Sequence, residues 1–104
     1  MSIENKETFN FLESLTHEKL SIADFIKTIR ECEEESQVEF AKRLGITRQR
    51  LCDIEHARSH ISPKLASEFA EKLGYSESQF VRLALQDILK RDHLDYIIKL
   101  QDVA

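Results

Sequence analysis

The sequence predicts an all-α fold, and three observations support this prediction. With two glycines and one proline among 104 residues, the chain has few residues that break helices. Apolar residues recur at three- and four-residue intervals through most of residues 21–92, which is the period of an amphipathic helix. A serine or threonine precedes each of these patterns, where its side-chain oxygen can cap a helix. We therefore expect five helices in one domain.

Composition narrows the class of protein. A hydrophobic content of 41% and a charged content of 33% are ordinary for a folded globular domain. Two cysteines are too few for a disulfide scaffold, and the polar N-terminus does not resemble a signal peptide, so we expect a cytoplasmic protein. No apolar run approaches the roughly 20 residues of a membrane span.

The first helix of this domain is predicted from residue 22 to about residue 31. Ser21 and Asp24 resemble a capping box. The apolar stripe expected to face the core consists of Ile22, Phe25, Ile26 and Ile29. The three glutamates at 33–35 then predict a solvated turn.

A second helix should start after Ser36, which forms a capping box with Glu39. Phe40 is expected to pack beneath it. Three further apolar residues are spaced to share one face of this helix: Val38, Ala41 and Leu44.

Gly45 can end the second helix sharply, because glycine adopts positive φ without a Cβ clash. A third helix should begin at once, with Thr47 as its N-cap and with Ile46 and Leu51 as a hydrophobic staple. Its outward residues are Arg48, Gln49, Arg50 and Asp53. A helix, a tight glycine turn and a helix with a polar outer face form the helix-turn-helix pattern.

These segments resemble the phage-repressor family of helix-turn-helix proteins, also called Cro-like or XRE. The matching residues are Gln37, Glu39, Ala41, Gly45, Ile54 and Glu55, and the likeness extends from about residue 22 to 75. It implies a five-helix Cro/repressor-like domain that binds double-stranded DNA. One residue departs from the family pattern. Ala57 stands where the family often has glycine, so we expect the turn after the third helix to differ.

Two more helices complete the predicted domain. Ser62 and Pro63 suit the N-cap and first position of the fourth helix, which Gly74 should end. Its buried face is either Leu65, Phe69 and Leu73 or Ala66, Ala70 and Leu73. For the fifth helix, Ser76 and Gln79 form a capping box and Tyr75 and Phe80 a staple. The fifth helix is apolar over a wide arc: Phe80, Val81, Ala84, Leu85, Ile88 and Leu89.

Two flanks lie outside the predicted domain at 21–92. Residues 1–20 form an extension with a short helix at 3–15, which either supports the domain or binds a partner. Residues 93–104 form a tail that alternates apolar and polar residues, as a strand does, although a continued helix is the alternative. A strand here would need its counterpart in another copy, which predicts an intersubunit β-ribbon. The residues expected in a homodimer contact are Leu85, Ile88, Leu89, Leu94, Tyr96 and Ile98.

Charge is distributed unevenly. The chain carries a net charge of −4, yet residues 36–64 hold six Lys or Arg against three acids, whereas the segments before and after are net acidic. The helix-turn-helix pattern thus lies in the only net-positive segment. Because attraction to phosphate acts within a Debye length of about 8 Å, such a patch can bind DNA on an acidic protein.

The resemblance implies that the third helix enters the major groove. Arg48 and Gln49 are the first candidates for base edges, because Arg suits guanine and Gln suits adenine. Arg50 is a candidate for either a base contact or a phosphate contact. Asp53 either accepts from a cytosine amino group, repels phosphate or holds Arg48 or Arg50. The phosphate candidates are Gln37, Arg43, Thr47, Arg58 and Lys64.

We expect a transcriptional regulator, most simply a repressor that binds a pseudo-palindromic operator as a homodimer. The alternative is an antitoxin that neutralises a toxin protein and represses its own operon, as many small members of the family do. We expect neither an enzyme nor a cofactor, because no nucleophile–base motif or phosphate loop is present. Cys52, His56 and His60 are spaced four apart, as metal ligands can be, but a fourth ligand is missing, so we predict no metal site.

Overall fold

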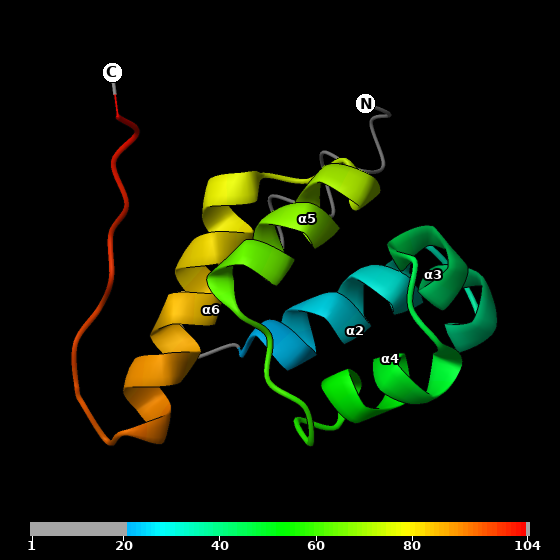
Figure 1. Ribbon diagram of the computed structural model, residues 1–104, viewed down its shortest axis with the longest axis horizontal. Helices are drawn as coiled ribbons and strands as arrows, with labels where there is room; N and C mark the ends of the chain where they lie inside the picture. Colours follow the sequence, from blue (N-terminus) through cyan, green and yellow to red (C-terminus); the bar gives the residue numbers. More distant parts are fainter. Residues whose placement is uncertain (1–20, 104) are drawn as a thin grey trace.

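The computed structural model describes residues 21–103, so the helix predicted at 3–15 lies outside the described residues. Within that range the fold is all-α, as predicted, and contains no strand. Its five helices are α2 (Ile22–Cys32), α3 (Gln37–Leu44), α4 (Arg48–Glu55), α5 (Pro63–Leu73) and α6 (Glu77–Arg91) (Figure 1). Among the described residues, no helix is both long and apolar enough to cross a lipid bilayer.

Each helix starts at the cap that the sequence predicts. In every case the hydroxyl oxygen accepts a hydrogen bond from the backbone N–H three residues later, at 3.1 to 3.3 Å. Such bonds satisfy one of the four N–H groups that a helix start leaves without a partner. The capping residues are Ser21, Ser36, Thr47, Ser62 and Ser76.

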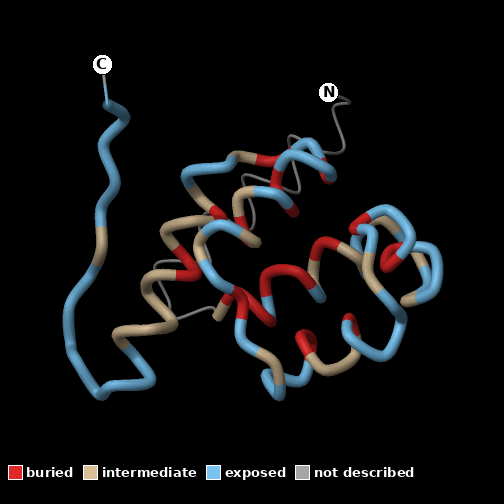
Figure 2. Tube along the Cα trace, viewed as in Figure 1, coloured by how far each residue is buried: buried red, intermediate tan, exposed pale blue. Residues whose placement is uncertain are grey.

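The core lies between α2 and the helices that surround it (Figure 2). All four residues of the predicted α2 stripe are buried. Phe25 meets Phe80 of α6 edge to face, with ring centroids 5.3 Å apart, and Tyr75 lies 6.3 Å from Phe80, as its predicted staple requires. Burial raises the pKa of Tyr75 to about 12, and its hydroxyl has no hydrogen-bond partner among the described residues.

Two details of the predicted helix faces are wrong. Val38 is 49% exposed, although Ala41 and Leu44 are buried. Three residues advance a helix by only about 300°, so a run with three-residue spacing drifts off one face, and Val38 ends up on the outside. In α6 the sequence prediction left out Leu83, which is buried, whereas Val81 and Leu85 are only half-buried.

Two glycines in the left-handed conformation end α3 and α5. Gly45 has φ +73° and Gly74 has φ +76°. Lys72 of α5 also supports the end of α3, because its ammonium donates to the Leu44 carbonyl at 3.0 Å. A Cβ added at Gly45 would lie 3.1 Å from that same ammonium nitrogen. The α3–α4 turn is thus fixed by backbone geometry and by a lysine from another helix.

The turn after α4 keeps the left-handed geometry, so the expectation that it would differ is wrong. Ala57 adopts φ +58°. The Arg58 N–H donates to the Asp53 carbonyl at 2.8 Å and the Ala57 N–H to the Ile54 carbonyl at 3.0 Å, which are the two bonds of a Schellman motif. Alanine therefore holds a conformation that suits glycine, at a cost of about 1 kcal/mol.

A similar motif ends α6. His93 has φ +58°, and the Leu94 N–H donates to the Leu89 carbonyl at 2.9 Å. The chain then reverses and runs back along α6 as an extended segment (Figure 1). The alternative of a continued helix is therefore wrong for residues 94–103. These residues also form no strand within one chain, and the ribbon with a second copy stays a prediction.

We predict that Ala57→Gly raises the free energy of unfolding by about 1 kcal/mol, because the left-handed strain is removed. Urea denaturation followed by circular dichroism measures this change. Gly45→Ala is the control of opposite sign, since it places a Cβ in the same backbone region, and it should lower the stability by at least about 1 kcal/mol. A loss of stability in Ala57→Gly would contradict the strain.

Candidate nucleic-acid interface

A buried ion pair joins α2 to α4. The Arg30 guanidinium donates to Glu55 through Nε at 2.7 Å and through Nη2 at 3.1 Å. The side chain of Glu55 is 1% exposed and that of Arg30 is 15% exposed. The hydrogen bonds to Glu55 raise the pKa of Arg30 above its ordinary value. Both oxygens of a buried carboxylate are thus satisfied by one planar partner.

The same pair positions the start of α3. The Gln37 amide donates to Glu55 Oε1 at 3.0 Å, and Arg30 Nη1 donates to the Glu35 carbonyl at 3.1 Å. Glu55 therefore fixes the last turn of α4 against both other helices of the region. This bond uses one of the two amide N–H groups of Gln37, so its second N–H and its carbonyl oxygen have no hydrogen bond to another described residue.

The helix α4 presents the predicted polar residues on its outer face. Arg48, Gln49 and Arg50 are exposed, whereas Leu51 and Ile54 are buried in the core. The first turn of α4 contains no acidic residue. The helix is anchored by one apolar side and by Glu55, and its N-terminal half projects a guanidinium, an amide and a second guanidinium into solvent.

Asp53 has partners other than those expected. Its Oδ1 accepts from Gln49 Nε2 at 3.1 Å and from Arg58 Nε at 3.0 Å, and it forms no hydrogen bond or ion pair with Arg48 or Arg50. The hydrogen bonds to Asp53 raise the pKa of Arg58 above its ordinary value. Asp53 therefore orients Gln49 and neutralises Arg58, so this arginine is a weaker phosphate candidate than the sequence suggests.

Arg43 is likewise neutralised. It forms ion pairs with Glu33, at 3.3 Å, and with Glu35, and its guanidinium carbon lies 5.6 Å from the centre of the Phe40 ring. These contacts use Arg43 to close the turn between α2 and α3. The predicted solvated turn at 33–35 is therefore wrong in part, because two of its glutamates are half-buried against this arginine.

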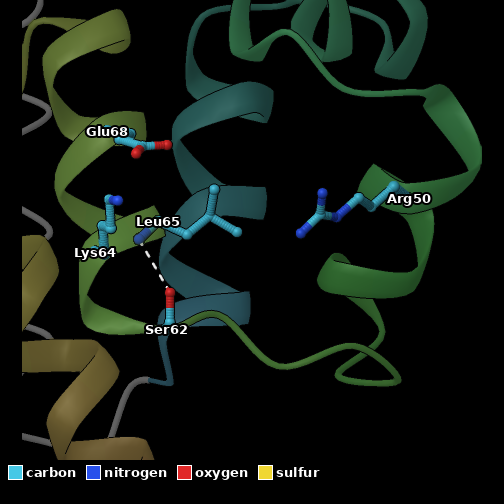
Figure 3. A pocket seen from close by; sticks show the side chains of 5 residues that line it. All are labelled: Arg50, Ser62, Lys64, Leu65 and Glu68. Carbon is cyan, nitrogen blue, oxygen red and sulfur yellow. Dashed lines mark hydrogen bonds between the residues drawn. The ribbon is translucent and has the colours of Figure 1, made fainter.

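Three cations differ from Arg43 and Arg58. Within residues 21–103, no ion pair involves Arg48, Arg50 or Lys64. Arg50 and Lys64 line a hollow of about 310 Å³ between α4 and α5, together with Ser62, Leu65 and Glu68. Figure 3 shows the Arg50 guanidinium reaching from α4 across this hollow toward Leu65. These three cations thus lie on α4 and at the start of α5.

Cys52 and His56 lie side by side at the end of α4. The Cys52 sulfur is 3.6 Å from His56 Nδ1 and 3.5 Å from Arg58 Nη2. His60 does not join them, and the described residues contain no group of three or more side chains that could hold a metal ion. A cationic guanidinium beside the sulfur is also a poor neighbour for a metal cation.

The comparison with protein families decides the identity of this arrangement. A helix-turn-helix family matches residues 26–80, which is slightly more than half of the chain and covers all of α3, α4 and α5. The chain belongs to the XRE-type helix-turn-helix family. Members of this family are DNA-binding transcription regulators and are usually not enzymes. Neither the curated proteins nor the solved structures gave a significant match.

The sequence could predict only some of the residues that form this site. The outward residues of α4 and the residues that flank Gly45 follow from a local pattern. The pair of Arg30 and Glu55 was not predicted, because its partners are 25 positions apart and nothing in their spacing links them. The only available signal was a glutamate on the inner side of α4, which requires a buried cation or donor nearby.

We predict that Glu55→Gln lowers the free energy of unfolding by about 3 kcal/mol, because it leaves the Arg30 charge buried without an anion. Thermal and urea denaturation measure this change. Glu31→Gln is the matched control: Glu31 faces Lys27 at 4.0 Å in an exposed pair, so it should cost less than about 0.5 kcal/mol. Equal costs for the two variants would show that the buried pair does not fix α4.

Proposed function

We propose that this protein is a transcriptional repressor that binds a pseudo-palindromic operator as a homodimer. The observation that carries the proposal is the set of open cations at α4: Arg48 and Arg50 are exposed and unpaired within residues 21–103, whereas Arg30, Arg43 and Arg58 are all neutralised. Desolvating an unpaired arginine against DNA breaks no existing ion pair. The open cations are therefore those best suited to bases and phosphates.

Arg48 and Gln49 are the proposed base-reading residues. Arg48 extends from the first position of α4, and a guanidinium can donate two hydrogen bonds to guanine O6 and N7. Asp53 accepts from the Gln49 amide nitrogen, so it limits the rotamers of Gln49 and leaves the amide carbonyl free to accept from an adenine or cytosine amino group. Asp53 thus contributes to base reading through Gln49.

Phosphates are proposed to bind on either side of α4. Lys64 lies at the start of α5, and Arg50 reaches across the hollow between the two helices. Thr47 keeps its hydroxyl hydrogen free to donate, since its oxygen caps α4 as an acceptor. At the start of α3, Gln37 and the backbone N–H groups form an anion-binding end of a helix. Arg43 and Arg58 are left out of this set because of their ion pairs.

A two-fold dimer would place two copies of α4 about 34 Å apart, one turn of B-DNA. The proposed dimer contact comprises α6 and the tail. Leu85, Ile88 and Leu89 are half-buried on α6, and Leu94 and Tyr96 are 46% and 68% exposed. Apolar side chains left in water at this density favour a protein partner.

The antitoxin is the alternative function. It is favoured by the same exposed tail, because a toxin could cover these side chains instead of a second copy. Both functions are compatible with operator binding. Purification of the protein from its native host, followed by identification of bound proteins, separates them: a stoichiometric second protein supports the antitoxin, and the protein alone contradicts it.

We predict that Arg48→Ala weakens binding to a duplex selected from a randomised pool by about 1–3 kcal/mol, with a smaller loss on random duplex DNA. Lys64→Ala should instead weaken both duplexes alike and lower the salt slope of binding by about one. Fluorescence anisotropy at several salt concentrations measures both. Lys27→Ala on α2, whose lysine is exposed outside the helix-turn-helix, should leave binding unchanged. Equal losses on both duplexes for Arg48→Ala would contradict base reading.

A further inference from the structure

The tail contains most of the large apolar side chains that the described structure exposes. Leu94, Tyr96, Ile97, Leu100 and Val103 are between 42% and 98% exposed. Apart from them, only Val38 is in this class within residues 21–103. The tail is extended, so its backbone also needs hydrogen-bond partners.

One edge of the tail already has partners, and they come from a single side chain. Gln86 of α6 donates through Nε2 to the Tyr96 carbonyl at 2.5 Å and accepts through Oε1 from the Ile98 N–H at 2.9 Å. The amide therefore takes the place that a residue of a neighbouring strand would have. It fixes residues 96–98 of the extended tail beside α6.

The opposite edge is open. In an extended chain the N–H and C=O groups of successive residues point to alternate edges, so those of Asp95, Ile97 and Lys99 point away from Gln86. None of these groups has a hydrogen bond to another described residue. A strand with one satisfied edge and one open edge is prepared to pair with a second strand.

We propose that this open edge pairs with the same edge of a second copy, in an antiparallel ribbon centred on Ile97. In this register the two Ile97 residues exchange their backbone hydrogen bonds. Asp95 then lies opposite Lys99 of the partner subunit, and Lys99 lies opposite the partner's Asp95. The two-fold symmetry creates two cross-strand ion pairs from one sequence.

The charge pattern selects this register. Asp95 and Lys99 are two residues on either side of Ile97, so only a pairing centred there brings both charges opposite their complements. Within one chain they are about 13 Å apart at a rise of about 3.3 Å per residue, so they cannot pair with each other. A centre at Ile98 would instead place Asp95 opposite Gln101 and Lys99 opposite Ile97.

The second face of the ribbon fits the same register. Leu94, Tyr96, Ile98 and Leu100 alternate with the charged residues and share one face. Pairing centred on Ile97 sets Leu94 opposite Leu100 and Tyr96 opposite Ile98, so this face is apolar throughout. It would close over the half-buried residues of α6 in both copies. The inference rests on the proposed homodimer and gives it a register.

Charge reversal tests the register. We expect Asp95→Lys and Lys99→Asp each to weaken the dimer at least tenfold in Kd, because each creates two like-charge contacts. The double variant Asp95→Lys/Lys99→Asp restores both pairs with reversed polarity, so its Kd should return to within about threefold of the original. Sedimentation equilibrium of the full chain without DNA measures Kd. Glu71→Lys, an equal charge change on the exposed face of α5, is the control and should leave the dimer unchanged.

A double variant that is as weak as the single variants, or a chain that is monomeric throughout, would overturn the ribbon. The far-ultraviolet circular dichroism spectrum of each variant should be unchanged, because both residues are exposed and lie outside the helices. Binding of the original chain and of Arg48→Ala to the selected duplex tests DNA recognition separately from the ribbon. If the chain is a monomer and Arg48→Ala still weakens its binding to this duplex, the ribbon is contradicted but DNA recognition through Arg48 is supported.

Discussion

The buried pair of Arg30 and Glu55 is the interaction on which the rest of the site depends. It places a charge from α2 against the last turn of α4, and the Gln37 amide joins it from the start of α3. Such a pair contributes little net stability over apolar residues, but breaking it is expensive. Its effect is therefore geometric, because alternative placements of α4 would leave a buried charge without a partner.

Six cations in and around the helix-turn-helix fall into two groups. Arg30, Arg43 and Arg58 each form an ion pair with a carboxylate. Arg30 joins α2 to α4, Arg43 closes the turn between α2 and α3, and Arg58 pairs with Asp53 near the end of α4. Arg48, Arg50 and Lys64 have no ion pair within the described range and lie on or beside the exposed face of α4. An acidic protein can thus present a positive surface, since its acids neutralise the structural arginines.

Local pattern predicted most of the fold. The five caps, the α2 stripe, the turn at Gly45 and the outward residues of α4 depend on neighbours within one or two helical turns. Contacts between distant segments could not be predicted in this way. The Arg30–Glu55 pair, the two acids on Arg43 and the Gln86 bridge to the tail each arise from tertiary packing. Local pattern also failed at single residues inside correctly predicted elements. Val38 is exposed because three-residue spacing does not stay on one face of a helix. Ala57 keeps a left-handed conformation because the hydrogen bonds that end α4 hold it there.

The central claim is that the N-terminal half of α4 enters the major groove of duplex DNA. Nuclear magnetic resonance of the ¹⁵N-labelled protein, titrated with a duplex selected from a randomised pool, tests it most directly. The account predicts that the largest shift changes fall on residues 47–50 and on the Arg48 and Gln49 side-chain N–H groups, with smaller changes at the starts of α3 and α5. Changes confined to other surfaces, with α4 unaffected at saturating DNA, would contradict it.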